Sequence, residues 1–233
     1  MDVGTGVDAS TEPMIANAPQ YLFAPADKPS LPLHEAPLVE ATDDSVQGYG
    51  CLIDHPDDID IEIVRWPATG WRKVDEDSGD EAGWVEGIFH GEWQGDVLYG
   101  HNEAVSGHYV LGWSTTDPQL ASTTQQTVPR DQVLLWHMNY HPDGAQLFFP
   151  QDRSAFVVPV ALPGDDLAVE QVIALWCDGS RGLYIHPGIW HDGIFPAAER
   201  QRFLDRQGRV HARVSCDLTA EFGVYLSVPL VQG

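Results

Sequence analysis

Two stretches, WHMNYHPDGAQLFFP at 136–150 and GLYIHPGIWHDGIFP at 182–196, decide the fold of this chain. Each combines histidines with aromatic and branched residues that favour strands, and each contains a turn with Pro and Gly. His137, Asn139 and His141 are spaced by two, so one strand would point all three side chains to the same face. Because a small β-barrel points alternate residues inward, these stretches predict a barrel with polar side chains in its interior.

The chain from residue 47 onward repeats short apolar or alternating runs that are separated by Gly, Pro and Asp. The runs are rich in Val, Ile, Tyr, Phe and Trp, which favours strands. We expect strands in IDIEIVRW (59–66), WVEGIFHGEW (84–93), GHYVLGW (107–113), QVLLWHMNY (132–140), AQLFFP (145–150), SAFVVPVAL (154–162), VIALWCDG (172–179), GLYIHPG (182–188), ARVSCDL (212–218) and FGVYLSVPL (222–230). So many runs at short spacing predict an all-β antiparallel sandwich or barrel.

Helix is expected only in short pieces. The segment at 165–172 fits one or two turns, and the segment at 197–208 fits either a short helix ended by Gly208 or a charged hairpin loop. The acidic stretch at 75–83 is expected to be a solvated turn, with a lid or a metal-binding loop as the alternative.

The N-terminal region is expected to form an arm rather than a domain. Residues 1–20 are polar and lack periodicity, and four prolines between 21 and 45 oppose a helix and favour an extended segment. We therefore divide the chain into an N-terminal arm at 1–46 and a single β-barrel domain at 47–233.

The composition excludes several classes of partner. The chain has 233 residues, with 12 Lys plus Arg against 35 Asp plus Glu, so its formal net charge is −23. Nucleic acid and anionic membranes would be repelled by this charge, and no apolar run approaches the roughly 18 residues of a membrane span. Three cysteines without a close pair, and a start without the features of a secretory signal, favour a cytoplasmic protein with reduced thiols.

The two histidine-containing stretches resemble a known family. PGIWH (187–191) is similar to the second cupin motif, and NYHPDGAQLFFP (139–150) resembles a degenerate first cupin motif. With AFVVPVALPGDDL (155–167) between them, they resemble the ureidoglycolate lyase family of cupins in order and spacing over roughly 135–196. The resemblance implies a double-stranded β-helix, or jelly-roll barrel, and a homodimer. It also implies a carbon–nitrogen lyase of purine catabolism that splits ureidoglycolate, a small-molecule substrate, into glyoxylate and urea.

The motif context suggests roles for the site residues. His141 and His191 are expected to be the acid/base pair, because imidazole exchanges protons near neutral pH. His186 is expected to be a third polar contact, and Gln146 to orient the ureido or hydroxyl group. The expected pocket walls are Tyr184, Trp190 and Phe148. The candidate clamps for the substrate carboxylate are Arg72, Arg153 and Arg181. If none of them lies near the two histidines, the lyase interpretation weakens and a neutral substrate or a bound metal cation is favoured.

The sequence leaves open whether the site binds a metal ion as a cofactor. Metal-binding cupins usually present His-x-His, then Glu, then a later His, but here Asn139 and Gln146 replace two of these ligands with amides that bind transition metals weakly. The candidate ligands of a divalent ion are His137, His141, His186, His191, His90 and Glu92. If the barrel closes across both halves of the chain, Glu92, Asp96 or Glu103 would reach the same cavity as His141. Two other functions therefore remain: a metal-dependent cupin dioxygenase or isomerase, and a non-catalytic small-molecule-binding cupin.

Overall fold

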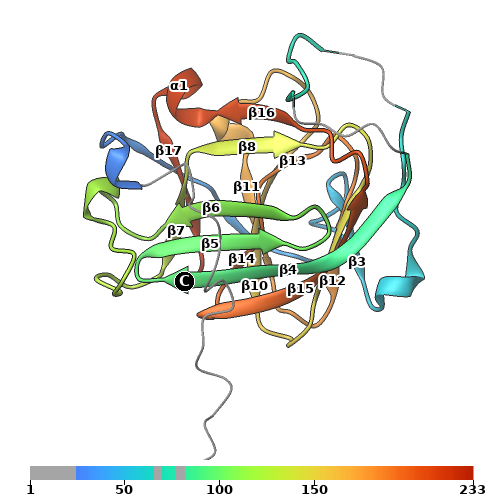
Figure 1. Ribbon diagram of the computed structural model, residues 1–233, viewed down its shortest axis with the longest axis horizontal. Helices are drawn as coiled ribbons and strands as arrows, with labels where there is room; N and C mark the ends of the chain where they lie inside the picture. The colour runs from blue at the N-terminus through green and yellow to red at the C-terminus, as the bar shows by residue number, and fades with distance from the viewer. Residues whose placement is uncertain (1–24, 66–69, 77–81, 233) are drawn as a thin grey trace, which may run out of the picture.

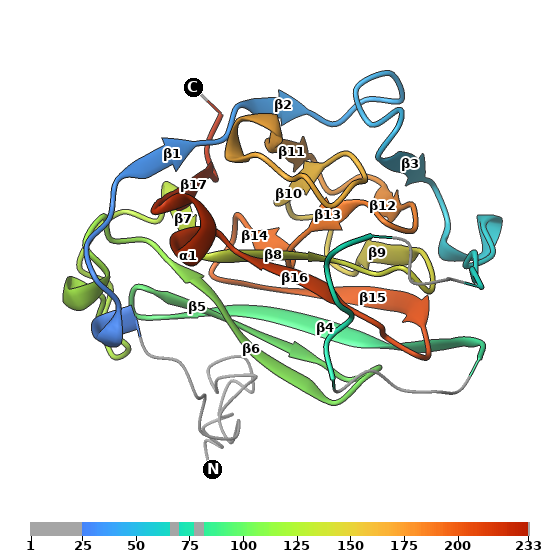
Figure 2. The same ribbon diagram turned by 90° about the horizontal axis from the view of Figure 1, so that it is seen from above.

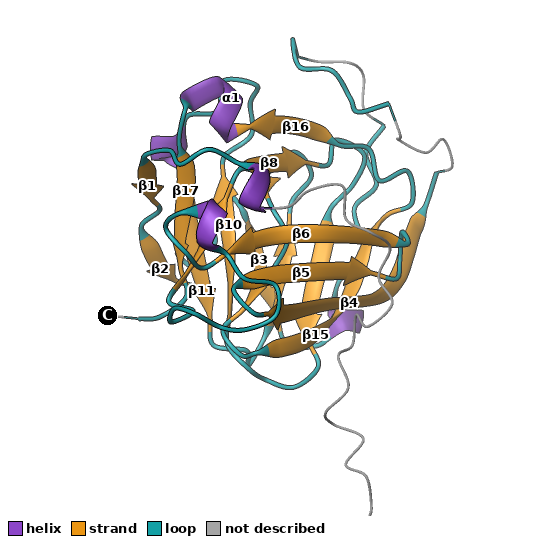
Figure 3. Ribbon diagram, turned by 60° about the vertical axis from the view of Figure 1, so that its left-hand side comes forward, coloured by secondary structure: helices purple, strands orange, loops and turns teal. Residues whose placement is uncertain are grey.

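The computed structural model describes residues 25–65, 70–76 and 82–232. Within these ranges almost every regular element is a β-strand, and the α-helix α1 (Leu218–Phe222) is only five residues long (Figure 3). No helix in the described part of the chain is long and apolar enough to cross a membrane. The all-β expectation is confirmed.

The described strands form two sheets (Figure 1). The larger sheet has the order β1 (Leu33–Glu35), β17 (Tyr225–Pro229), β7 (Gln132–Leu135), β6 (Gly107–Trp113), β5 (Val97–Asn102), β4 (Trp84–Gln94), β15 (Arg200–Gly208), β9 (Gln146–Pro150), β12 (Gly182–Ile185) and β3 (Gly50–Ile53). The smaller sheet has the order β16 (Val214–Asp217), β8 (His137–Tyr140), β13 (Trp190–His191), β10 (Phe156–Ala161), β11 (Ile173–Cys177) and β2 (Leu38–Glu40), with β14 (Phe195–Pro196) beside β10. Four short 3-10 helices lie at Pro25–Asp27, Pro56–Asp58, Pro118–Leu120 and Val169–Gln171.

One hydrophobic core joins the two sheets. Phe203 of β15 in the larger sheet packs edge-on against Phe156 of β10 in the smaller sheet, with 5.2 Å between the ring centroids. Phe89 of β4 packs in the same way on Phe148 of β9, at 5.7 Å. These four aromatic side chains are buried in one continuous cluster, which makes the two sheets the walls of a single barrel like the expected cupin jelly roll.

The described part of the predicted arm is extended, as its prolines indicate. Strand β1 pairs in parallel with β17, and β2 pairs in parallel with β11, so this segment adds one edge strand to each sheet (Figure 2). Residues 1–24 of the arm lie outside the described residues.

Two of the expected elements are wrong. The segment at 197–208 is neither helix nor hairpin loop but contains β15, a nine-residue strand between β4 and β9. Its alternate residues Phe203 and Asp205 are buried, whereas Arg202 between two buried neighbours is exposed. The expected strand at 59–66 is also absent from its described residues, which contribute only an isolated bridge between Ile63 and Gly144.

Candidate active site

A cavity of about 540 Å³ opens between the two sheets, within the size range of small-molecule sites. Its walls come from β4, β5, β6 and β9 of the larger sheet and from β8, β13 and β16 of the smaller one. The polar side chains that line it are Asp75, Asn102, His108, Asn139, His137, His141, Gln146, His191, Asp192, His211, Arg213 and Ser215. The cavity therefore brings polar side chains of both sheets together in one place.

His141 and His191, the predicted acid/base pair, meet in this cavity with 5.1 Å between their ring centroids. His141 follows β8, and His191 lies on β13, which pairs with β8. The turn before β13 holds the two together, because the backbone N–H of Gly188 donates to the His141 carbonyl at 2.9 Å. Gly188 has a φ of 79°, a conformation that favours glycine and explains the Pro-Gly turn of the motif.

Hydrogen bonds to the backbone fix the tautomer of both rings. Nδ1 of His141 donates to the carbonyl of Ala212 at 2.9 Å, and Nδ1 of His191 donates to the carbonyl of Ile189 at 2.8 Å. A carbonyl oxygen can only accept, so the proton of each neutral ring is on Nδ1 and the lone pair is on Nε2. His141 therefore has the form of a general base. Nε2 of His191 instead faces Oε1 of Gln146 at 3.2 Å, an amide oxygen that can only accept a hydrogen bond.

Burial keeps these rings neutral. It lowers the pKa of His191, and it lowers the pKa of His141 well below 6.5, where the neighbouring His211 and His191 add repulsion. His211, which the sequence analysis missed, lies with its ring centroid 4.7 Å from that of His141. Burial, Arg213 and His191 lower its pKa to about 4.

Gln146 connects His191 to a buried carboxyl group that the sequence analysis also missed. Oε1 of Gln146 lies 3.2 Å from Nε2 of His191, and its Nε2 donates to Oδ1 of Asp205 at 2.8 Å. The side chain of Asn102 donates to the other oxygen of Asp205 at 2.8 Å. Asp205 comes from β15, which had been expected to be a helix or a loop.

Asp205 is fully buried, and its two carboxyl oxygens accept hydrogen bonds from the side-chain amides of Gln146 and Asn102 rather than from a cationic side chain. Burial raises its carboxyl pKa to about 7, and the hydrogen bonds from Gln146 and Asn102 only partly oppose that rise. Near neutral pH this group therefore holds a proton for part of the time, behind the Gln146 side chain that faces the cavity.

His137 and Asp192 form an ion pair in the cavity wall, with 2.9 Å between Nδ1 and Oδ2. Burial opposes the charged ring of His137, but the attraction and hydrogen bond of Asp192 outweigh it and raise the His137 pKa above its usual value. His137 thus differs from His141 and His191, because Asp192 stabilises its charged form.

The structure does not bring the three selected arginines to the cavity. Arg72 makes a bidentate ion pair with Glu221, at 2.7 and 2.6 Å. Arg181 pairs with Asp43 at the surface, and Arg153 is exposed in a turn with a φ of 58°. Arg213, which was not selected, lines the cavity instead. It precedes β16, in a turn held by the His141–Ala212 hydrogen bond.

His186 and two of the predicted pocket walls also lie elsewhere. Tyr184 and His186 share a face, as predicted, but it is the outer face of β12, because Leu183 and Ile185 occupy the core. The Tyr184 hydroxyl accepts from the backbone N–H of Glu62, and His186 lines a separate pocket.

Trp190 precedes His191 and therefore points to the opposite side of β13, where its indole donates to the Gly164 carbonyl at 2.6 Å. Of the predicted walls, Phe148 lines the cavity.

The predicted metal ligands do not form a group that could hold a metal ion in the described residues. In residues 25–65, 70–76 and 82–232, no three His, Cys, Asp or Glu side chains are placed to hold a metal ion. His90 is bound to Glu103 at 2.8 Å outside the cavity wall, and Glu92 lies two residues further along β4. Asp96 instead accepts hydrogen bonds from Ser122 and Thr127. Glu92, Asp96 and Glu103 do not line the cavity, whereas Asn102 of β5 and His108 of β6 do.

Comparisons with known proteins identify the family of this chain. A family model described as ureidoglycolate lyase matches residues 115–220, the range that holds the described site residues from Trp136 to Ser215. The ureidoglycolate lyase of Azotobacter vinelandii is 35% identical over 124 residues, which are 46% of this chain and 73% of that protein. The ureidoglycolate lyase of Stutzerimonas stutzeri is 37% identical over 130 residues, 49% of this chain and 75% of its own length. That of Pseudomonas fluorescens is 36% identical over 120 residues, 44% and 72% of the two chains. The chain belongs to the ureidoglycolate lyase family.

Proposed function

We propose that this protein is a lyase that cleaves ureidoglycolate, or a closely related ureido acid, into glyoxylate and urea. The observation that carries the proposal is the pair of neutral imidazoles, His141 and His191, in a cavity that also holds Arg213. Relatives that are named ureidoglycolate lyase, and that are 35–37% identical to this chain over the matched segments, support the same reaction.

Arg213 is the group that we assign to the substrate carboxylate. Guanidinium binds a carboxylate through two parallel hydrogen bonds, and Arg213 lies in the cavity wall close enough to His211 to lower its pKa. This placement leaves the hemiaminal carbon of the substrate toward His141 and His191.

The reaction needs one proton to move. A base removes the proton of the substrate hydroxyl, the oxygen forms a C=O bond, and the C–N bond breaks with its electron pair on the urea nitrogen. Nε2 of His141 is suited to accept the first proton, since that ring carries its lone pair there, whereas Nε2 of His191 lies against Oε1 of Gln146. The resulting imidazolium then returns the proton to the leaving nitrogen, so the enzyme ends in its starting state.

The residues present do not fit a metal-assisted version of this reaction. Asn139 and Gln146 offer amides at two of the positions where metal-binding cupins have His and Glu, and Gln146 is already bound to Asp205 and His191. We therefore assign the proton transfers to the histidines and derive no step through a metal ion. Unchanged turnover after exhaustive chelation would support this assignment, and activity that returns only with an added metal would contradict it.

Separate His141→Ala and His191→Ala variants test the proposed function. Each is expected to lower kcat about 10²- to 10⁴-fold, the usual contribution of a positioned acid or base. Release of urea and of glyoxylate would be followed together. A matched His55→Ala variant removes an exposed histidine that pairs with Asp57 at the surface, and it should keep full activity. Full activity in both cavity variants would overturn the assignment.

The proposal also covers the pathway, the cellular compartment and the oligomeric state of the protein. Placement in purine catabolism follows from the substrate, and the three free thiols of Cys51, Cys177 and Cys216 support a reducing compartment such as the cytoplasm. A homodimer is proposed from the family resemblance, and light scattering of the purified protein tests it.

A further inference from the structure

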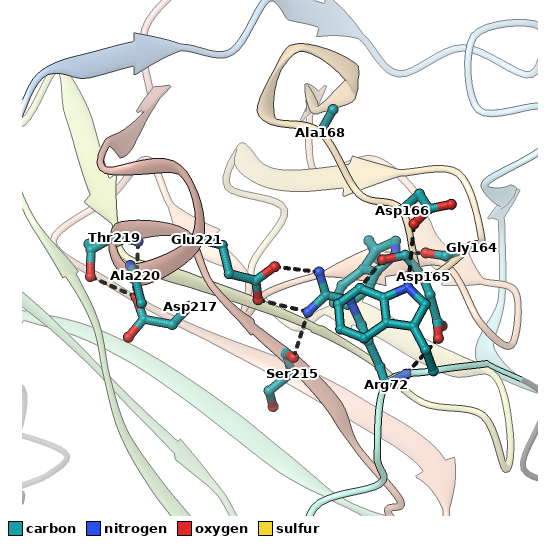
Figure 4. Close-up of polar contacts among 12 residues, drawn as sticks. Arg72, Gly164, Asp165, Asp166, Ala168, Ser215, Asp217, Thr219, Ala220 and Glu221 are labelled. Carbon is teal, nitrogen blue, oxygen red and sulfur yellow. Dashed lines mark hydrogen bonds and ion pairs between the residues drawn. The ribbon is translucent and has the colours of Figure 1, made fainter.

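Residues 70–76 form a strap that is fastened across one side of the barrel (Figure 4). Arg72 is its anchor: its backbone N–H donates to Oδ2 of Asp165 at 2.7 Å, and its Nε donates to the Asp165 carbonyl at 2.8 Å. Its two terminal nitrogens bind the carboxylate of Glu221 on α1. The guanidinium also lies over the rings of Trp71 and Trp190, at 4.4 and 5.4 Å from their centroids. An arginine that is held by so many groups fixes the strap firmly.

The strap delivers Asp75 to the cavity, three residues after the anchor. The backbone N–H of Asp75 donates to the Arg213 carbonyl at 2.8 Å, and the Ser215 hydroxyl donates to Oδ2 of Asp75 at 2.8 Å. The same Oδ2 lies 3.8 Å from Nε of Arg213. About a third of each side chain is exposed, so the pair lies where the cavity meets solvent.

Asp75 and Arg213 form an ion pair without a hydrogen bond between the two charged atoms. At 3.8 Å the two groups attract each other as charges, but the distance is too long for a hydrogen bond. The Asp75 carboxylate thus offsets the charge of Arg213 without the bidentate geometry that Arg72 and Glu221 achieve. A substrate carboxylate that binds Arg213 bidentately would lie next to the fixed carboxylate of Asp75.

We propose that Asp75 is a specificity-determining residue that competes, from within the chain, with the substrate carboxylate for Arg213. Asp75 lowers the affinity of the cavity for small carboxylates, and it penalises a second negative charge on the ligand more than the first. The cavity then accepts monoanionic acids and rejects dianionic ones. This inference rests on the proposed function, because it takes Arg213 as the carboxylate-binding group.

The test is the affinity of the full-length protein for glyoxylate and for oxalate, a monoanion and a dianion of similar size, measured by titration calorimetry. Asp75→Asn keeps the shape of the side chain and removes its charge. For charges about 6 Å apart near a protein surface, this should tighten glyoxylate binding about a hundredfold, and oxalate binding by a larger factor. The matched control is Asp43→Asn, which removes the same charge from the surface pair with Arg181 and should change neither affinity.

The possible outcomes separate this inference from the proposed function. Equal affinities in Asp75→Asn and the wild type, or an equal gain for glyoxylate and oxalate, would overturn the role of Asp75 while leaving the lyase activity intact. Weaker glyoxylate binding in Asp75→Asn would also overturn it, because Asp75 would then support the ligand or Arg213. If Arg213→Gln binds glyoxylate as well as the wild type does, Arg213 is not the carboxylate site and both proposals fail.

Discussion

Asp205→Asn should make the folded protein more stable at neutral and alkaline pH. The substitution replaces a fully buried carboxyl group with an amide of the same shape. Burial raises the carboxyl pKa from its usual 3.8 to about 7, so the folded state holds a proton that the unfolded chain has already released. The amide resembles the protonated carboxyl group and has no charge to lose.

The sign and size of the effect follow from proton linkage. Below pH 3.8 both states of Asp205 are protonated and its contribution to stability is fully present. Between 3.8 and about 7 only the unfolded chain ionises, so the contribution is lost as pH rises through the folded pKa. Each pH unit between the two pKa values costs 1.36 kcal/mol, which amounts to about 4 kcal/mol at pH 8.

Urea unfolding of the wild type and of Asp205→Asn at pH values from 4 to 8 measures this difference. The free energy of unfolding of the variant minus that of the wild type should rise by about 4 kcal/mol over this range. Asp96→Asn is the matched control of opposite sign: hydrogen bonds from Thr127 and Ser122 outweigh burial and lower the Asp96 pKa, so this variant should lose stability at neutral pH. A difference for Asp205→Asn that does not change with pH would refute the reasoning.

Three further predictions follow from the site and the strap. The acid limb of kcat/KM should lie below pH 6.5, because burial lowers the pKa of His141 and only its neutral form acts as the base. A limb above pH 6.5 in the rate profile would contradict this. Gln146→Glu should create strong divalent-metal binding with His141 and His191, which zinc titration of the variant and of the wild type with a chelating dye would compare. Glu221→Gln should lower the free energy of unfolding by about 1–3 kcal/mol, because Arg72 is almost fully buried and loses a charged partner. Loss of the exposed Arg181–Asp43 pair should lower it by under about 1 kcal/mol in the same urea assay.

Much of the fold could be predicted because most strands carry their pattern in apolar residues. The runs at 107–113 and 145–150 correspond to β6 and β9 within a residue or two. Strand β15 was missed because its inward positions include Gln201, Asp205 and Gln207, so the alternation that marks a strand is polar on both faces. A strand whose buried face carries polar side chains loses the apolar alternation by which strands are usually predicted.

The residues of the candidate site also divide into those that the sequence predicts and those that it does not. His141 and His191 could be selected because each lies in a motif with its own turn. Arg213 lies in the run at 212–218, which was expected to be an ordinary strand, and His211 directly precedes it. The hydrogen bonds of Ala212 to His141 and Asp143 bring both residues to the cavity. Arg72 was selected for carboxylate binding, and it does bind carboxylates, but those of Asp165 and Glu221 in its own chain. Sequence indicates what a side chain can bind, whereas the fold decides which partner reaches it.

The net charge of −23 should disfavour an anionic substrate, and the cavity does little to reverse this before the reaction begins. Its two cationic groups, Arg213 and His137, each face an aspartate. His141 and His191 are neutral because burial lowers their pKa values. When one of these rings takes the hydroxyl proton, however, a new positive charge appears in a buried site beside the substrate carboxylate. The attraction between them is absent in the bound ground state and present as the C–N bond breaks. Such an arrangement places electrostatic stabilisation in the transition state rather than in substrate binding.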